Sequence, residues 1–327
     1  MEHYIRPISI LQYNIYDVFY NDAGSIVLIL PSEVSPPPKI QLQGADTLLD
    51  FTVYTCPHNH TYIYTCETAF SEHIELRIQG VCVSTSVHRY PEMPNTIIMS
   101  TIVKNEDAYI RQWIRYHQSL GVSAFVIYDN SNTGTLGTLL ADFVHEGLVI
   151  LIHWPFAYQL KRSGISGQTT QQNHSIYAFQ TCSYIGLFDI DEYVNPQTTA
   201  CSLDTFFATL LSEKQIDRTK ISGFQVRNKF FYNPQNLPTN DYEFLRIVNS
   251  THITKGGREK NFVIPKHVRT FSVHMVTDGL PIYRVDESLL YFNHYYFLNK
   301  QSRGRQQTNI VDDTILSNAR PFLEHER

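Results

Sequence analysis

Four short and almost uninterrupted apolar runs in the middle of the chain constrain its fold most. They span residues 96–103, 124–128, 148–153 and 184–188. A run of this length is typical of a strand buried on both faces of a sheet. The intervening segments, residues 106–120, 135–146 and 168–181, read as helices, and glycines close the first two. This alternation predicts an α/β fold with a mostly parallel sheet and right-handed crossovers.

Residues 1–93 have a different pattern and predict a small antiparallel β-rich domain, most simply a sandwich. Strand-like stretches at 25–30, 50–55, 61–65 and 74–78 are separated by turn-forming clusters. Pro91 and Pro94 mark a boundary because two prolines so close disfavour a continuous element. We therefore expect a β-rich domain at 1–93, an α/β domain at 94–305 and a polar C-terminal tail at 306–327. After Pro196 the pattern loosens, with strands expected only near 224–231, 268–275 and 289–296.

Composition excludes several classes of protein. The chain has 327 residues, 43% of them hydrophobic and 17% charged, which is enough for two packed domains and argues against disorder. Its net charge of −5 argues against a nucleic-acid partner. Five cysteines without a Cys-x-x-Cys spacing exclude a zinc knuckle or a disulfide scaffold. The longest apolar run, residues 26–30, is far shorter than the ~20 residues of a membrane span, so we expect a soluble, cytoplasmic protein.

The most specific motif lies directly after the fourth apolar run. Asp189, Asp191 and Glu192 occupy the carboxyl end of the predicted strand, which is the edge where open α/β sheets bind ligands. Acids crowded in this way need a cation or solvent, and Mg²⁺ or Mn²⁺ is bound by such carboxylates together with phosphate oxygens. The alternative is a solvated turn whose acids cap the next element. A haloacid-type phosphohydrolase is excluded because Glu192 and Tyr193 occupy the positions where that motif needs Gly and then Thr or Val.

Polar residues also follow the first two strands. Lys104, Asn105 and Glu106 stand at a predicted helix start, where backbone amides and the positive dipole end suit a nucleotide. Asp129 ends the second strand and can accept from a ribose hydroxyl or a base N–H. The alternatives are that Asn105 and Glu106 only cap the helix and that Asp129 only forms a turn. Taken together, the three clusters predict a nucleoside diphosphate across the sheet, with its metal on the acidic pair.

These residues, in this order and spacing, resemble the catalytic domain of glycosyltransferase family 92, a member of the GT-A superfamily. The resemblance covers about residues 95–302. It is carried by Lys104-Asn-Glu106, Trp113-Ile114, Tyr116-His117, Leu120-Gly-Val122, Tyr128-Asp-Asn130, Trp154, Cys182, Asp189-Ile-Asp-Glu-Tyr193, Lys260-Asn-Phe-Val-Ile-Pro265, Val273-His274, Asn293-His294-Tyr295 and Lys300-Gln-Ser302. It implies a Rossmann-like GT-A fold; a β-rich N-terminal domain is compatible with such enzymes.

The resemblance also implies an activity: a metal-dependent glycosyltransferase that moves a sugar from a nucleotide-sugar donor to a glycan hydroxyl with inversion. The donor is expected to be a UDP-sugar and the metal Mn²⁺ or Mg²⁺. By the same resemblance, Asp189 and Asp191 hold the metal, and Glu106 and Asp129 contact the ribose and base. A histidine, His294 or alternatively His274, completes the metal shell, and Lys300 reaches a phosphate. From its place on the apolar face of a predicted helix, His117 is expected to be structural.

Inversion requires a carboxylate that deprotonates the acceptor. Glu259, beside the flexible Gly256 and Gly257, is our candidate for this base, and the alternative is a solvated loop acid. The stretch 161–172 is expected to be a lid over the donor from which Gln171 or Gln172 reaches it, or else a plain linker.

Two other classes of function compete with this interpretation. A catalytically inactive protein that binds a nucleotide sugar or carbohydrate would lack a competent metal site, whereas a nucleotidyltransferase would need a Gly- and Lys/Arg-rich triphosphate loop after the first strand. Three sequons, at Asn59, Asn173 and Asn249, would be glycosylated only in the secretory pathway. Because Asn173 lies on the helix predicted beside the donor, and no membrane anchor is predicted, the sequence favours a cytoplasmic protein of viral or microbial type.

Overall fold

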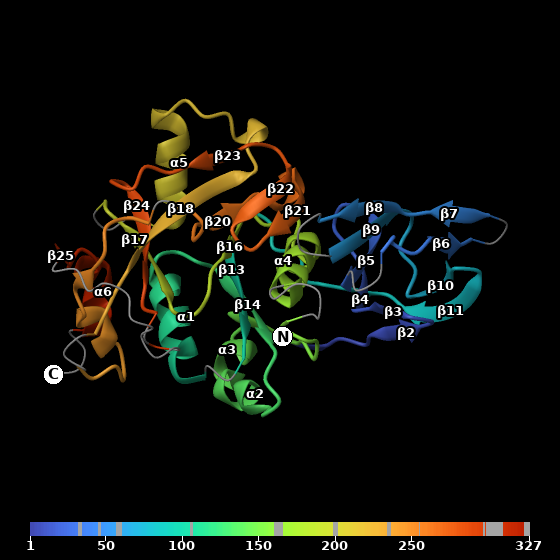
Figure 1. Ribbon diagram of the computed structural model, residues 1–327, viewed down its shortest axis with the longest axis horizontal. Coiled ribbons are helices and arrows are strands. Elements are labelled where there is room, and N and C mark those ends of the chain that lie inside the picture. The colour runs from blue at the N-terminus through green and yellow to red at the C-terminus, as the bar shows by residue number, and fades with distance from the viewer. Residues whose placement is uncertain are drawn as a thin grey trace.

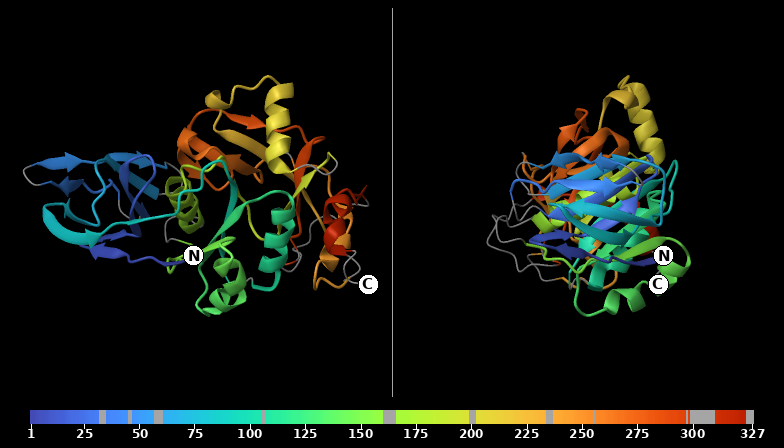
Figure 2. Two further views of the ribbon diagram at one scale, coloured as in Figure 1. Left: turned by 180° about the vertical axis from the view of Figure 1, so that it is seen from behind. Right: turned by 90° about the vertical axis from the view of Figure 1, so that its right-hand side faces the viewer.

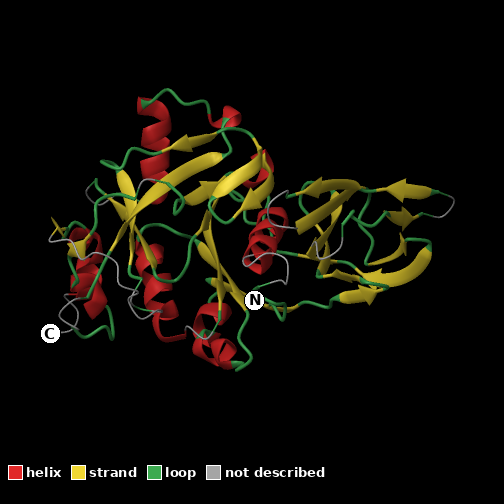
Figure 3. Cartoon of the chain, viewed as in Figure 1, coloured by secondary structure: helices red, strands yellow, loops and turns green. Residues whose placement is uncertain are grey.

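The computed structural model of the chain has two units arranged end to end (Figure 1; Figure 2). The structure describes residues 1–323 except 32–34, 45–46, 57–60, 105–106, 160–165, 199–201, 234–236, 255, 297 and 299–309. Within the described residues, the N-terminal unit consists of strands and loops, and the helices belong to the larger unit (Figure 3).

The N-terminal unit is a sandwich of two sheets. Its strands are β2 (Ile8–Ile10), β3 (Tyr13–Ile15), β4 (Asp17–Tyr20), β5 (Ser25–Pro31), β6 (Ile40–Gln43), β7 (Leu48–Asp50), β8 (Thr52–Thr55), β9 (Thr61–Glu67), β10 (His73–Ile78), β11 (Val81–Ser86) and β12 (His88–Arg89). One sheet has the order β11-β10-β6-β7 and the other the order β12-β4-β5-β9-β8. Leu28 and Tyr64 of the second sheet share a buried core with Leu42 and Leu76 of the first.

Strand β5 is apolar from Ile26 onward because both of its faces are buried. Its residues alternate between the sandwich core and a second core, to which Val27 and Ile29 contribute. Helix α4 (Ser166–Ala178) supplies Ile176 to that second core and lies between the two units (Figure 1). It packs against β5 and β9 on one side and against β13 (Ile97–Val103) and β21 (Val268–Ser272) of the larger unit on the other. The helix therefore joins the two units.

The larger unit is built on a ten-stranded sheet of order β1-β15-β14-β13-β16-β20-β18-β24-β17, with β23 paired to β18 off this path. The strands are β1 (Glu2–Tyr4), β13 (Ile97–Val103), β14 (Ala124–Asp129), β15 (Val149–His153), β16 (Tyr184–Leu187), β17 (Glu192–Pro196), β18 (Gly223–Phe230), β20 (Lys260–Val263), β23 (Ile282–Arg284) and β24 (Leu290–His294). The pairs from β1 to β16 are parallel, whereas β20 is antiparallel to both of its neighbours. The sheet is therefore parallel in one half and mixed in the other.

Helices cover both faces of the sheet, and α4 lies on one of them. The other helices are α1 (Ile110–Ser119), α2 (Thr135–Leu139), α3 (Ala141–His145), α5 (Leu203–Glu213) and α6 (Ile315–Leu323), with 3₁₀ turns η1 (Asp107–Tyr109), η2 (Arg218–Lys220), η3 (Glu243–Arg246) and η4 (Pro265–His267). Helix α6 packs against β17 and η3, at the mixed half of the sheet. Phe125 and Ile127 of β14 pack with α1, α2, α3 and α5, while Val126 and Tyr128 pack with α4. Burial on two faces explains why these strands are continuous apolar runs.

The structure differs from the sequence expectation at several elements. Residues 2–4, expected within the β-rich unit, form β1 and extend the large sheet beside β15. The expected helix 135–146 is divided at Leu140 into α2 and α3. The expected polar tail 306–327 contains β25 (Ile310–Val311), paired with β19 (Asn249–Ser250), and α6, whose Ile315 and Ala319 are fully buried. The expected strand 268–275 is a hairpin of β21 (Val268–Ser272) and β22 (Met275–Gly279).

The elements without an expected counterpart include α5, β17 and β20. Strand β17 begins at Glu192, inside the acidic motif. It is buried although it contains polar residues, so its sequence does not have the pattern of a buried strand. Within the described part of the chain, none of the helices is both long and apolar enough to cross a membrane.

Candidate metal and substrate site

The acidic motif forms a tight turn between two buried strands. β16 ends at Leu187 and β17 begins at Glu192. Phe188 and Ile190 are each 1% exposed and belong to the main core, so the intervening acids alternate with buried anchors. The backbone N–H of Asp189 donates to Glu192 Oε2 (2.9 Å), and the N–H of Glu192 donates to the Asp189 carbonyl (3.1 Å). These two bonds fix the turn that presents the acids.

Asp191, Glu192 and His294 form a compact donor group. β17 pairs with β24 so that Glu192 lies directly opposite His294. His294 Nε2 lies 3.4 Å from Asp191 Oδ2, and His294 Nδ1 lies 3.6 Å from Glu192 Oε1. One ligand atom from each of the three lies within 4.8 Å of the others, and all three residues are buried. Two carboxylates and one imidazole are a donor set that divalent cations accept.

Asp189 has different partners. Lys260, on β20, is 1% exposed, and its Nζ lies 2.8 Å from Asp189 Oδ2 and 3.0 Å from Glu192 Oε2. Gln168 Nε2 of α4 donates to Asp189 Oδ1 at 3.0 Å, and the Tyr158 hydroxyl donates to Gln168 Oε1 at 3.0 Å. The side chain of Asp189 is nevertheless 42% exposed. The two aspartates of the motif are therefore not equivalent.

Burial and mutual repulsion set the charges of this group. Burial, opposed by Lys260 and reinforced by Asp189, raises the pKa of Glu192 to about 7. Burial also acts to raise the pKa of Asp189, but the Lys260 ammonium outweighs it and the pKa is lowered. Burial acts to lower the pKa of His294, but the Asp191 carboxylate outweighs it and the pKa is raised. Burial thus disfavours ionised carboxylates here, and an added cation would offset that penalty.

The acids line a cavity of about 260 Å³. Its lining consists of Ile102, Lys104, Tyr158, Asp189, Asp191, Glu192, Arg258, His274, His294 and Tyr296. Lys104 and Arg258 place basic groups beside the acids, and the two tyrosines place aromatic rings there. Carboxylates that can bind a divalent cation, together with basic groups, suit a ligand that carries phosphates.

Several residues expected from the sequence come together here. Asp189, Asp191, His274 and His294 all line the cavity, as does Lys104. Of the two histidines, His294 lies in the donor group. His274 instead donates from Nδ1 to the Glu259 carbonyl at 2.9 Å, and burial, followed by the Lys260 charge, lowers its pKa.

Asp129, Gln172 and Glu259 are not among the described residues that line the cavity. Asp129 Oδ1 accepts from the backbone N–H and the hydroxyl of Ser131, which is the turn-forming alternative. Gln172 is 3% exposed within α4. Glu259 is 7% exposed, and its carboxylate accepts from the Arg258 backbone N–H at 3.1 Å.

The expected nucleotide contact Glu106 and the expected phosphate contact Lys300 lie outside the described residues, as do residues 161–165 of the expected lid. The remainder of that stretch, residues 166–172, forms the first part of helix α4. Lys104, two residues before Glu106 in the sequence, is exposed and lines the cavity.

Sequence reasoning gave no role to Glu192, Lys260, Gln168 or Arg258. Glu192 belonged to the acidic motif, but its role depends on its position opposite His294. That position is known only once the pairing of β17 with β24 is known. Gln168 lies one helical turn before Gln172, so the helix was expected but its facing residue was not. The sequence does not indicate which residues Lys260 contacts, because neighbouring strands bring Asp189 and Glu192 to it.

The fold and this cavity define an α/β protein whose sheet edge carries a buried group of acids and one histidine. Residues 95–322 match the family model described as glycosyltransferase family 92. The chain therefore belongs to glycosyltransferase family 92, which confirms the resemblance.

Curated relatives agree with this assignment. A glycosyltransferase family 92 protein of Ricinus communis is 20% identical over 232 residues, 68% of this chain and 40% of that protein. One of Arabidopsis thaliana is 28% identical over 98 residues, 30% of this chain and 16% of that protein. The chain thus spans two fifths or less of the length of these relatives.

Likeness to solved structures is loose. TarS of S. aureus (residues 1–349) has a TM-score of 0.33 and 9% identity, covering 62% of this chain and 60% of that chain. The tandem Ig repeats of Dlar have a TM-score of 0.17 and 14% identity, covering 30% of this chain and 58% of that chain. The family assignment rests on sequence.

Proposed function

We propose that this chain transfers a glycosyl group from a nucleotide-sugar donor to a hydroxyl of a glycan acceptor, with inversion, in the cavity around Asp189 and Asp191. Family membership supports the reaction class. The observation that carries the proposal is the donor group Asp191–Glu192–His294, which shares one cavity with the basic side chains of Lys104 and Arg258. The sheet order β15-β14-β13-β16, followed by antiparallel strands, supports a GT-A arrangement.

The residues fit a divalent cation. Their ligand atoms lie within 4.8 Å of one another, and all three residues are buried, so the two carboxylates have little solvent to stabilise their charge. Asp191, Glu192 and His294 would hold Mn²⁺ or Mg²⁺, with Asp189 adjacent. The bound ion would supply Lewis-acid stabilisation of negative charge on the departing diphosphate.

The chain's own residues supply the remaining interactions. Lys104 and Arg258 are exposed, and basic groups at that place favour the diphosphate of a UDP-sugar electrostatically. Lys260 keeps Asp189 ionised, and Gln168 orients its carboxylate. Glu259 stays our candidate for the acceptor base. Its carboxylate accepts from the Arg258 N–H, so this role requires the side chain to turn toward the acceptor.

The test is a panel of UDP- and GDP-sugars with Mn²⁺, measured for nucleotide binding and nucleotide release. We expect binding and release with at least one UDP-sugar, and Asp191→Asn should abolish Mn²⁺-dependent release. Asp204→Asn, an exposed acid in the first turn of α5, is the matched control and should behave as the unsubstituted chain. Absence of nucleotide binding, or full metal-dependent turnover of Asp191→Asn, would contradict the proposal.

Binding without turnover is the alternative that one contact favours. The Lys260 ammonium already neutralises part of the acidic group, which is what a metal-independent binding protein would need. In that case, the same panel would give nucleotide-sugar binding that is insensitive to chelators, and no nucleotide release.

We also propose that the protein acts in the cytoplasm, on the evidence of one sequon. Asn173 is fully buried in α4, and its Nδ2 donates to the carbonyls of Thr169 and Phe271 at 2.8 Å. A glycan at this position is incompatible with the folded chain. When the chain is secreted through a glycosylating pathway, molecules modified at Asn173 should therefore be poorly folded. Mass spectrometry of the peptide that contains Asn173 measures whether the residue is modified.

A further inference from the structure

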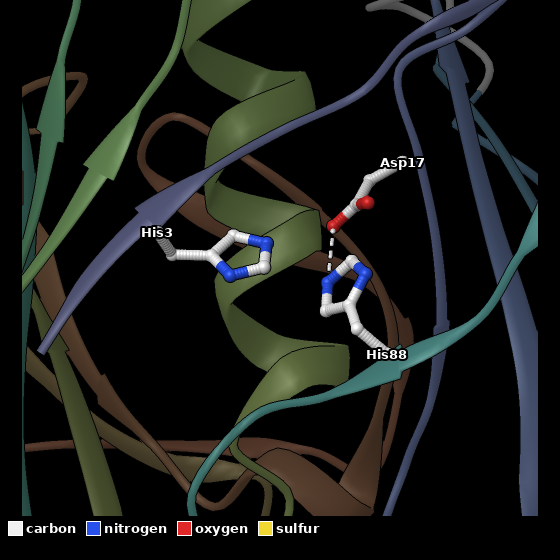
Figure 4. Close-up of side chains that lie close together, drawn as sticks. All are labelled: His3, Asp17 and His88. Carbon is white, nitrogen blue, oxygen red and sulfur yellow. Dashed lines mark ion pairs between the residues drawn. The ribbon is translucent and has the colours of Figure 1, made fainter. Parts of the chain in front are cut away.

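A second group of metal-ligating side chains lies at the junction of the two units, away from the proposed active site. His3 projects from β1, the strand that extends the large sheet, whereas Asp17 begins β4 and His88 begins β12 of the N-terminal unit. Figure 4 shows the three side chains converging from these segments. One ligand atom of each lies within 4.8 Å of the others.

One of these ligand atoms is buried without a partner, and a second has only a long contact. His3 Nε2 is shielded from solvent and makes no hydrogen bond to the described residues. His88 Nε2 is also shielded, and its contact is the ion pair with Asp17. His88 Nε2 approaches Asp17 Oδ2 at 3.4 Å, and the His3 and His88 rings lie 4.2 Å apart between centroids. Buried polar atoms without partners are costly, and bound ions are one way in which proteins satisfy them.

The carboxylate is held in position by a surrounding shell. Asp17 is 2% exposed; its Oδ1 accepts from the Val18 N–H at 2.9 Å, and its Oδ2 accepts from the Tyr90 hydroxyl at 2.8 Å. His174 Nε2 lies 2.8 Å from the same Oδ2, while its Nδ1 lies 2.7 Å from the Tyr128 hydroxyl. Such outer contacts orient metal ligands in known sites. They also fix the carboxylate while the two histidines are left to face it.

The charge balance points the same way. Among the ion pairs of the described residues, Asp17 pairs only with histidines, so this buried carboxylate has no lysine or arginine as a permanent counter-charge. A divalent cation bound by the two histidines and the aspartate would provide that charge.

We propose that His3, Asp17 and His88 bind a divalent transition metal of the zinc class, which ties the edge strand β1 of the large sheet to the N-terminal unit. Two imidazoles and one carboxylate favour zinc-like ions over Mg²⁺ or Ca²⁺. Bonds of about 2.0–2.1 Å place tetrahedral ligand atoms about 3.3 Å apart, so side-chain shifts of modest size close the group around an ion. The side chain of His88 is 29% exposed, so the group lies close to the protein surface. This site does not depend on the proposed glycosyl transfer.

The test uses the full chain, with any affinity tag removed and metals stripped by a chelator. Asp191→Asn and His294→Gln are introduced together so that the other donor group cannot contribute. We expect this double variant to bind about one equivalent of Zn²⁺ by calorimetry. It should also develop Co²⁺ absorption bands in the visible that Zn²⁺ abolishes, a readout that needs no change in the proposed ligands.

Substitution then identifies the ligands. In the same background, His3→Gln and His88→Gln should each weaken Zn²⁺ binding by at least about 10-fold, and Tyr90→Phe, which removes an outer contact, by about 10-fold. His73→Gln, an exposed histidine of the same unit, should leave binding unchanged. The proposal is overturned if the double variant binds no equivalent of Zn²⁺ and shows no Zn²⁺-displaceable Co²⁺ spectrum. It is also overturned if folded His3→Gln and His88→Gln retain full affinity.

Discussion

Lys260 and Asp189 form an ion pair in which the ammonium Nζ lies 2.8 Å from Asp189 Oδ2, on a lysine that is 1% exposed. The first aspartate of the acidic motif therefore has a fixed cation beside it. The second, Asp191, faces His294 instead. This division of partners makes separate predictions for the two halves of the motif.

Replacing Lys260 by Met should destabilise the fold. The change leaves Glu192, which is buried, and Asp189, which is partly exposed, without their cation. Loss of one partner of a buried pair costs about 3–5 kcal/mol, and we expect about 2–3 kcal/mol here because Asp189 is solvated. Chemical denaturation measures the free energy of unfolding. Lys39→Met, at an exposed ion pair, is the control and should change the free energy of unfolding by less than about 1 kcal/mol. Equal effects of the two substitutions would show that the buried ion pair contributes no more to stability than the exposed one.

The two histidines predicted from the sequence should separate in metal affinity. His294→Gln removes a member of the donor group and should weaken Mn²⁺ binding by at least about 10-fold. His274→Gln should change it less than about 3-fold, because His274 donates to the Glu259 carbonyl and lies outside that group. Titration with Mn²⁺ followed by electron paramagnetic resonance measures both affinities. The reverse order would place the metal next to His274.

Gln168, rather than Gln172, should affect turnover. Gln168→Met removes the hydrogen bond to Asp189 Oδ1, and bonds to charged groups contribute about 1.5–3 kcal/mol, so kcat/KM for the active donor should fall about 10- to 100-fold. Gln172→Met is the matched control on the same helix. Its buried Oε1 has no hydrogen-bond partner among the described residues, and activity should stay within about 2-fold. A larger loss in Gln172→Met would restore the role that the sequence suggested for this residue.

His117 should make stability depend on pH. It is fully buried; its Nδ1 lies 2.8 Å from the Trp113 carbonyl, and its Nε2 accepts from the Val194 N–H at 3.2 Å, which requires a neutral ring. Burial, opposed only by the bond to the Trp113 carbonyl, lowers its pKa to about 3. The structural role expected for His117 is thereby confirmed.

The sign follows from linkage. Below pH ~6.5 His117 is protonated in the unfolded state but stays neutral in the folded state. The contribution of the neutral His117 ring to the free energy of unfolding is therefore complete above that pH. It falls by about 1.4 kcal/mol per pH unit on acidification toward pH 3. The free energy of unfolding measured from pH 7 to pH 5 should therefore fall less steeply in His117→Gln than in the unsubstituted chain. Identical slopes in the two proteins would contradict this prediction, because they would mean that His117 takes up its proton at the same pH in the folded and the unfolded state.

Much of this protein is determined by local sequence. The runs that form β13, β14, β15 and β16 are predominantly apolar because both sheet faces are buried, and this pattern is readable without a structure. The acids after β16 were placed at the sheet edge for the same reason, and the ordered motifs sufficed to recognise the family.

Tertiary structure decided which side chains meet. Lys260 reaches Asp189 because β20 lies next to β16, and His294 faces Glu192 because β24 pairs with β17, and neither pairing is encoded in spacing along the chain. The same holds for His3, which meets Asp17 and His88 only because β1 crosses to the large sheet. Strand periodicity tells which residues are buried, but the partners of a buried charge depend on contacts between segments that are 70 or more residues apart.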